Sequence, residues 1–156
     1  MRLIIVSNSL PIKIEEQNSE FTFTRSSGGL ATGLSSLDID IETLWIGFPG
    51  IFPESAEKQA EISKIFHADN LFPVFISPEQ YQDYYEGYSN STLWPLCHYF
   101  FVYVECEKAY WKAYQEVNQL FLDELLKIAQ PDDLIWVQDY QLMLLPTMIR
   151  QALPDI

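Results

Sequence analysis

The residues best suited to chemistry lie in one aromatic stretch. From Asp83 to Tyr99, five aromatic rings stand among short polar side chains, which are Ser89, Asn90, Ser91 and His98. A core segment would repeat its apolar residues with a period of about 2 or about 3.6, and this stretch does not. Aromatic faces cover the C–H surface of a sugar, while hydroxyls and amides bond its O–H groups. The stretch therefore favours a binding wall for a hydroxyl-rich ligand, and an aromatic-rich loop that caps the domain core is an equally good interpretation.

Further polar residues directly follow predicted strands. The β-branched run Arg2–Ser7 predicts a buried strand, and its end delivers Ser9 into a loop. The apolar run Leu134–Val137 predicts another strand, and Asp139 follows it. In open α/β sheets, ligands gather at the carboxyl ends of the strands. Asp139 can accept hydrogen bonds from sugar hydroxyls or cap a helix predicted over Leu142–Ile149, and the residues favour neither role.

A pair of glycines, Gly28 and Gly29, precedes a helix predicted from Leu30 to about Leu37. Glycines let the backbone approach a ligand, and the free N–H groups at a helix start bind anions. A tight turn before the helix accounts for the same residues without a ligand. The sequence has no GxGxxG and no GxxxxGK[ST] pattern, so neither a dinucleotide fingerprint nor a P-loop is supported.

Strand and helix patterns alternate along the rest of the chain. Ser77 before Pro78 predicts a helix start, and a stripe of apolar residues at helical spacing predicts that the longest helix faces the core. The predicted elements are a hairpin of Ile12–Glu16 with Phe21–Thr24, strands over Leu44–Phe48 and Leu71–Ile76, and helices over Glu54–Ala68 and Lys108–Gln130. Such alternation implies a parallel sheet with right-handed crossovers. We expect an α/β, Rossmann-like domain with helices on both faces of the sheet.

Composition excludes several classes of protein. The chain has 156 residues, 48% of them hydrophobic, which suits one globular domain. Nine Lys and Arg against 22 Asp and Glu give a net charge of −13, which argues against nucleic-acid and membrane partners. The two cysteines form no zinc pattern with His67 or His98, so we expect no metal site. The N-terminus shows neither a signal peptide nor a membrane span, and a cytoplasmic protein follows by default.

Six segments, in this order and at these intervals, resemble the N-terminal part of the trehalose-6-phosphate synthases, the retaining glucosyltransferases of family 20. They are VSNSLPIK, RSSGGLATGL, LWIGFPG, YYEGYSNSTLWPLCHY, YQEVN and DLIWVQDYQLMLLP. The resemblance spans the chain and implies the acceptor-binding half of a two-domain GT-B fold. We expect residues 1–156 to form that domain, truncated at its C-terminal end and lacking the nucleotide-sugar domain, because two such domains need roughly two to three times as many residues.

The reaction implied by the resemblance transfers glucose from UDP-glucose to glucose 6-phosphate with retention of configuration. Its products are trehalose 6-phosphate and UDP, and it needs neither a metal nor another cofactor. Family enzymes are thought to use no covalent nucleophile, so charge stabilisation in a closed site between the two domains does the work. We expect a homo-oligomer, and we expect the isolated chain to be inactive.

The resemblance also implies roles for individual residues. Gly28 and Gly29 match the glycine pair that approaches the UDP-glucose diphosphate. Tyr85 and Asp139 match acceptor-binding positions, and Asp139 is the expected catalytic residue. Trp45 matches a tryptophan that lines the same pocket.

Two further substrate-binding positions complete the expected site. Trp94 matches a tryptophan associated with the choice of anomer. Ser9 stands where the family carries an arginine that contacts the acceptor phosphate, and losing such a contact costs roughly 1.5–3 kcal/mol. Gln138 and Gln141 stand where many members carry histidine, which we interpret as subfamily variation.

Three hypotheses remain open at this stage. The chain is the acceptor half of an active synthase, a non-catalytic sugar-phosphate-binding regulatory paralogue, or part of a related GT-B enzyme with a different acceptor. Ser9 is the residue that separates them. The match at Tyr85, Trp94, Asp139 and both glycines favours the first.

Overall fold

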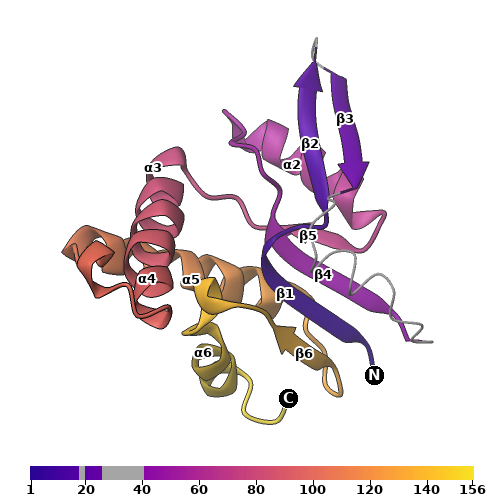
Figure 1. Cartoon of the computed structure of the whole chain (residues 1–156). Helices are drawn as coiled ribbons and strands as arrows, with labels where there is room; N and C mark the ends of the chain where they lie inside the picture. Colours follow the sequence, from indigo (N-terminus) through magenta and orange to yellow (C-terminus); the bar gives the residue numbers. More distant parts are fainter. Residues whose placement is uncertain (18–19, 26–40) are drawn as a thin grey trace.

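A computed structural model describes residues 1–17, 20–25 and 41–156 of the chain (Figure 1). The glycine pair Gly28–Gly29 and the helix predicted from Leu30 lie outside the described residues. The predictions for these positions therefore stay predictions.

Four parallel strands form the central sheet, which confirms the predicted α/β class. The strands are β1 (Leu3–Ser9), β4 (Thr43–Phe48), β5 (Leu71–Pro73) and β6 (Leu134–Val137). Their order across the sheet is β5-β4-β1-β6, so the first strand is central. Leu3 aligns with Thr43 on one side and with Leu134 on the other. β1 is nearly all buried because strands of a parallel sheet are covered on both faces, as its apolar run predicts.

The predicted hairpin is also present. β2 (Ile12–Gln17) pairs in antiparallel fashion with β3 (Glu20–Arg25), and Ile12 lies opposite Arg25. This two-stranded ribbon is separate from the main sheet and stands away from it in Figure 1. It is an excursion from the loop that follows β1.

Helices cover both faces of the sheet. α2 (Ala56–His67) begins at Ser55, whose side chain accepts from the Lys58 N–H, and buries Ile62 and Phe66 against Leu3, Ile5 and Trp45. The opposite face, with Ile4, Val6 and Ile46, packs against α5 (Lys108–Ile128) and α6 (Leu145–Ala152). Successive residues of a strand point to opposite faces, which is why neighbours in β1 belong to two different cores.

The aromatic stretch is helical, so its interpretation as a loop is wrong. α3 (Pro78–Tyr81) leads into the π-helix η1 (Gln82–Leu93), followed by α4 (Trp94–Cys97) and the 3₁₀ turn η2 (Phe101–Tyr103). In a π-helix each N–H bonds the carbonyl five residues earlier, so the apolar side chains recur later than in an α-helix. This is why the stretch shows no 3.6-residue period.

Two elements have boundaries that differ from the predicted ones. The strand predicted over Leu71–Ile76 ends at Pro73, although Val74 still donates its N–H to the Gly47 carbonyl at 2.9 Å. The last helix begins at Leu145, not at Leu142, because a separate 3₁₀ turn, η3 (Tyr140–Leu142), comes before it. Apolar residues beyond Pro73 thus report burial in the core and not strand pairing.

Candidate active site

The strand order itself marks one place in the sheet. From β1 the chain goes to β4 and then to β5 on one side, and it returns to β6 on the other side of β1. The direction of winding therefore reverses between β1 and β6. In open α/β sheets a crevice opens at the carboxyl ends of the strands where winding reverses, and ligands bind there. Ser9 ends β1 and Asp139 follows β6, so both predicted residues lie at this point.

Asp139 has a strained backbone. Its φ of 73° and ψ of 168° belong to a region that is almost restricted to glycine. Its carboxylate Oδ1 accepts the Tyr140 N–H at 2.8 Å, so Asp139 caps η3 and not the helix predicted over Leu142–Ile149. A conformation of this kind costs roughly 1–3 kcal/mol and persists only where its surroundings enforce it.

Tyr114 and Asn118 of α5 hold this turn in place. The Tyr114 hydroxyl donates to the Tyr140 carbonyl at 2.7 Å and accepts the Met143 N–H at 3.0 Å. The Asn118 amide donates to the Tyr114 carbonyl at 2.9 Å and to the Gln141 carbonyl at 3.1 Å. Both side chains are buried, so these hydrogen bonds are shielded from water. The motif YQEVN thus positions the motif QDYQ. From its helical periodicity alone, YQEVN would be expected only to pack in the core.

The wall beside Asp139 comes from η1 and α4. The Tyr140 ring lies 5.5 Å from the Trp94 ring, and its hydroxyl donates to the Asn90 side chain at 3.0 Å. Tyr85 stacks on Tyr81 at 4.9 Å and is close enough to raise the pKa of Tyr140. Trp94 and Asp139 therefore lie beside Tyr140, and Tyr85 lies nearby in the same wall. The sequence did not reveal a role for Tyr140.

Ser9 is connected to the same wall through Asn8. The Asn8 amide donates to the Ser9 hydroxyl at 3.2 Å, and the Asn8 carbonyl oxygen accepts from the Tyr84 hydroxyl at 2.9 Å. Tyr84 is fully buried in η1. Ser9 itself is exposed, as a residue that meets a ligand must be.

Trp45 lies on the other face of the sheet. It is only 8% exposed and belongs to the core that α2 covers, whereas Tyr84 belongs to the opposite core. Its indole N–H donates to the Ser7 hydroxyl at 2.7 Å, and that hydroxyl donates to the Ser9 carbonyl at 2.8 Å. The structure does not bring Trp45 together with Tyr85, and instead connects it to the backbone of the first loop.

Gly47 is a site-forming residue that the sequence did not single out. A Cβ atom at this position would lie 2.7 Å from both the Leu10 nitrogen and the Ser9 carbonyl carbon. The loop after β1 closes onto β4 here, with the Leu10 N–H donating to the Phe48 carbonyl at 3.0 Å. Only glycine lets two backbones approach so closely.

The phenols of the site stay protonated near neutral pH. Burial raises the pKa of Tyr114 to about 12, against the opposing hydrogen bond from Met143, and burial also raises the pKa of Tyr81 to about 12. The pKa of Tyr140 is also raised, mainly by burial and to a smaller extent by the nearby Tyr85 and Asp139. These hydroxyls therefore keep their protons and can donate hydrogen bonds near neutral pH.

Comparison with known proteins now identifies the family. The family model described as glycosyltransferase family 20 matches residues 1–156. The chain belongs to glycosyltransferase family 20. This agrees with the resemblance carried by the six motifs.

The family 20 relatives include curated synthases. The chain is 43% identical over 153 residues to an alpha,alpha-trehalose-phosphate synthase (UDP-forming) of Botryotinia fuckeliana, covering 97% of this chain and 29% of the relative. It is 41% identical over 155 residues to the corresponding synthase of Schizosaccharomyces pombe, covering 99% and 30%. The chain thus spans about a third of the length of these relatives.

Solved structures of family 20 proteins share the fold. The trehalose-phosphate synthase of Burkholderia xenovorans in complex with glucose-6-phosphate has a TM-score of 0.72 and 26% identity, covering 97% of this chain and 31% of that one. The trehalose-6-phosphate protein from E. coli bound with UDP-2-fluoro glucose has a TM-score of 0.72 and 26% identity, covering 97% and 30%. The Rossmann-like half of a GT-B fold is therefore confirmed.

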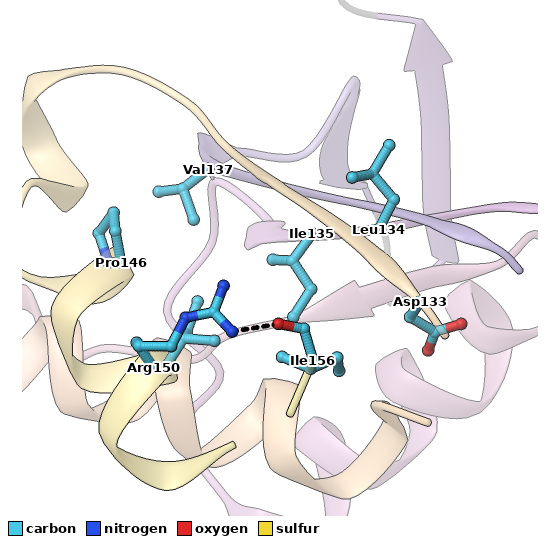
Figure 2. Close-up of a pocket in the computed structure, with 8 residues that line it drawn as sticks. Asp133, Leu134, Ile135, Val137, Pro146, Arg150 and Ile156 are labelled. Atoms are coloured by element: carbon cyan, nitrogen blue, oxygen red, sulfur yellow. Dashed lines mark hydrogen bonds between the residues drawn. The ribbon is translucent and has the colours of Figure 1, made fainter. Parts of the chain in front are cut away.

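A pocket of this family 20 chain lies along the outer edge of β6, apart from the candidate site (Figure 2). It is lined mainly by apolar groups of β6 and α6, including Ile135, Val137 and Pro146. Arg150 crosses it to donate to the carbonyls of Pro154, at 3.1 Å, and Ile156. None of the predicted site residues that the structure describes lines this pocket.

No three His, Cys, Asp or Glu side chains in the described part gather closely enough to hold a metal ion. No described helix is both long and apolar enough to cross a membrane.

Proposed function

We propose that this chain is the acceptor-binding half of a glucosyltransferase that makes trehalose 6-phosphate and UDP from UDP-glucose and glucose 6-phosphate, with retention of configuration. The observation that carries the proposal is the gathering of Tyr85, Trp94 and Asp139 around Tyr140, at the reversal point between β1 and β6. The names of the relatives support the reaction, since they are UDP-forming trehalose-phosphate synthases.

The geometry suits recognition of a sugar acceptor. The exposed Asp139 carboxylate accepts hydrogen bonds from sugar hydroxyls, while the half-exposed Trp94 ring offers its face to the C–H surface. The strained turn fixes the carboxylate in position before the sugar arrives, which lowers the entropy cost of binding. In our proposal the donor sugar comes from a second domain, so this chain alone is not expected to release UDP.

Ser9 supports a second candidate. It occupies the place of the phosphate-binding arginine, and a hydroxyl provides no charge to balance a phosphate. An acceptor without a phosphate group, or a regulatory sugar-binding role, is therefore the alternative function.

A binding titration separates these candidates. The intrinsic fluorescence of the 156-residue chain, which includes exposed Trp94, is followed during addition of glucose 6-phosphate and, separately, of glucose. We expect glucose 6-phosphate to bind and Asp139→Asn to weaken its binding about ten-fold or more, because a carboxylate acceptor of hydroxyl hydrogen bonds is lost. Asp132→Asn, at an exposed position before β6, serves as the control.

Each hypothesis predicts a different result of this titration. Tighter binding of glucose than of its 6-phosphate favours the alternative acceptor. An Asp139→Asn variant with unchanged affinity for both sugars contradicts the site. Turnover of UDP-glucose by the 156-residue chain alone contradicts the proposal that a second domain supplies the donor.

A further inference from the structure

An exposed, aromatic-rich segment of the chain includes α4 and η2. We define the aromatic loop as residues 93–104, LWPLCHYFFVYV. Its base is closed by two hydrogen bonds: the Glu105 N–H donates to the Ser91 carbonyl at 2.9 Å, and the Thr92 hydroxyl donates to the Glu105 carbonyl. The loop is therefore a defined, tied-down unit, and its far end carries η2.

The end of the aromatic loop is almost entirely in solvent. Val102 is 93% exposed and Tyr99 is 81% exposed, and Phe100, Phe101 and Tyr103 are also exposed. Internal hydrogen bonds hold the shape, such as the Phe100 N–H to the Pro95 carbonyl at 2.8 Å. The proposed sugar site uses Trp94 at one end of this loop but none of these five side chains.

Tyr99 follows the C-cap of α4 in a Schellman motif, in which the Tyr99 N–H donates to the Leu96 carbonyl at 3.2 Å and the Phe100 N–H donates to the Pro95 carbonyl. The Tyr99 φ of 63° is the left-handed conformation that this helix cap requires. The Tyr99 ring meets Phe101 edge to face at 6.1 Å, and Phe100 meets Tyr103 in the same way at 6.5 Å. The cap and these ring contacts give the exposed rings a defined local arrangement.

The size of the surface points to a macromolecular partner. At 150–250 Å² for a whole aromatic side chain, the five exposed residues present roughly 700 Å² of mostly apolar surface. This exceeds the largest patch of a typical monomer, which is roughly 300–600 Å². Two such surfaces buried against each other remove roughly 1,400 Å² from water, within the range of a stable protein interface.

The charges favour a second copy of this chain as that partner. The aromatic loop has no charged residue, in a chain of net charge −13, so two copies can meet there without repulsion at the centre. The adjoining residues carry both signs, with Glu105 and Glu107 beside Lys108 and Lys112. In a two-fold interface, acidic residues of one copy can then face lysines of the other.

We propose that the aromatic loop is the contact surface of a symmetric homodimer. Val102 and its aromatic neighbours form the apolar centre, and the mixed charges around Glu105 and Lys108 form the rim. This goes beyond the expectation of a homo-oligomer because it names the surface, and it does not depend on the identity of the acceptor sugar.

Sedimentation velocity over roughly two decades of concentration tests the proposal. We expect the 156-residue chain to dimerise, and Val102→Asp to weaken the dimer about ten-fold or more, because a carboxylate would be buried at the centre. Val102 makes little contact within the chain, so the variant should keep its circular dichroism spectrum and melting temperature. Phe101→Ser is a second variant that adds no charge.

Leu134→Asp is the matched control. Leu134 is 56% exposed on the open edge of β6, a second apolar region that could associate. Association that Leu134→Asp removes and both loop variants leave unchanged overturns the proposal, and so does a chain that stays monomeric throughout. A monomer that co-sediments with phosphatidylcholine vesicles through the aromatic loop would show a membrane partner and would also overturn it.

Discussion

At the scale of single residues, Ser9 and Tyr114 control the candidate site in different ways. Ser9 is exposed and touches the site through its side chain, whereas Tyr114 is buried and acts through the backbone of η3. Substitutions at these two positions therefore test ligand recognition and ligand positioning separately.

We predict that Ser9→Arg strengthens binding of glucose 6-phosphate about ten-fold or more. A guanidinium would supply a charge-assisted, bidentate contact to the phosphate. The gain should shrink as salt rises, and glucose should show no gain. Calorimetry at low and high salt measures both effects. An unchanged affinity for the phosphorylated sugar would place its phosphate away from Ser9.

We predict that Tyr114→Phe weakens sugar binding while the fold survives. The ring stays in the core, but the Tyr140 carbonyl and the Met143 N–H lose their bridging hydroxyl, at a cost of about 1–3 kcal/mol. Relaxation of the strained Asp139 turn should lower affinity for glucose 6-phosphate more than it lowers the melting temperature. Tyr110→Phe, on the same helix, is the control. Equal losses of affinity in the two variants would contradict a positioning role for Tyr114.

At the scale of elements, the site depends on close approach between backbones. Gly47 lets the end of β1 lie against β4, and Gly87 lets η1 lie against α5, where a Cβ atom would come within 2.6 Å of the Tyr110 ring. The neighbours differ in kind, because Gly47 faces backbone atoms and Gly87 faces a side chain that can move.

We predict that Gly47→Ala destabilises the protein more than Gly87→Ala. Overpacking against a fixed backbone costs roughly 1–3 kcal/mol, and a ring that shifts relieves part of that cost. Gly47→Ala should also disturb Ser9 and reduce binding of glucose 6-phosphate. Urea unfolding curves and a sugar titration of both variants provide the comparison. Greater destabilisation by Gly87→Ala would contradict the explanation by backbone contact.

At the scale of the whole molecule, one ion pair joins segments that lie far apart in the sequence, Arg2 and Asp133. The Arg2 guanidinium donates to both carboxylate oxygens of Asp133, at 3.0 and 2.6 Å, and also to the Ile128 carbonyl at 2.9 Å. This ties the start of β1 to the start of β6 and to the end of α5. The Asp133 side chain is nearly inaccessible to water, so the pair is stronger than an ordinary surface pair.

This pair predicts a loss of stability in acid. The hydrogen bond from Arg2 lowers the pKa of Asp133 below its ordinary value of 3.8. The stabilisation is therefore complete above that value, where the unfolded carboxyl is also ionised, and it is lost as pH falls through the lower folded pKa. We expect Asp133→Asn to cost about 2 kcal/mol at neutral pH and to flatten the acid limb of the stability curve. Asp132→Asn, at the adjacent exposed residue, should leave that limb unchanged.

Much of the fold follows from the sequence by itself. Apolar runs and helical spacing determined the strands and the long helices, because burial imposes those periods on any chain of this class. The same local reasoning found Ser77 as a helix cap, which the structure confirms with a capping box to Gln80. Six motifs in order determined the family.

Only the tertiary structure decided how these parts form a site. The order of the strands brings Ser9 and Asp139 to one edge, and no local pattern encodes which strands are neighbours. Alternation along β4 sends Trp45 to the opposite face, where it supports the first loop and does not meet Tyr85. Long-range packing also selects the π-helix and the strain at Asp139, because both are unfavourable locally. The π-helix is tied to the first loop by the Tyr84 hydroxyl, which donates to Asn8, and the turn at Asp139 is held by the buried Tyr114 hydroxyl.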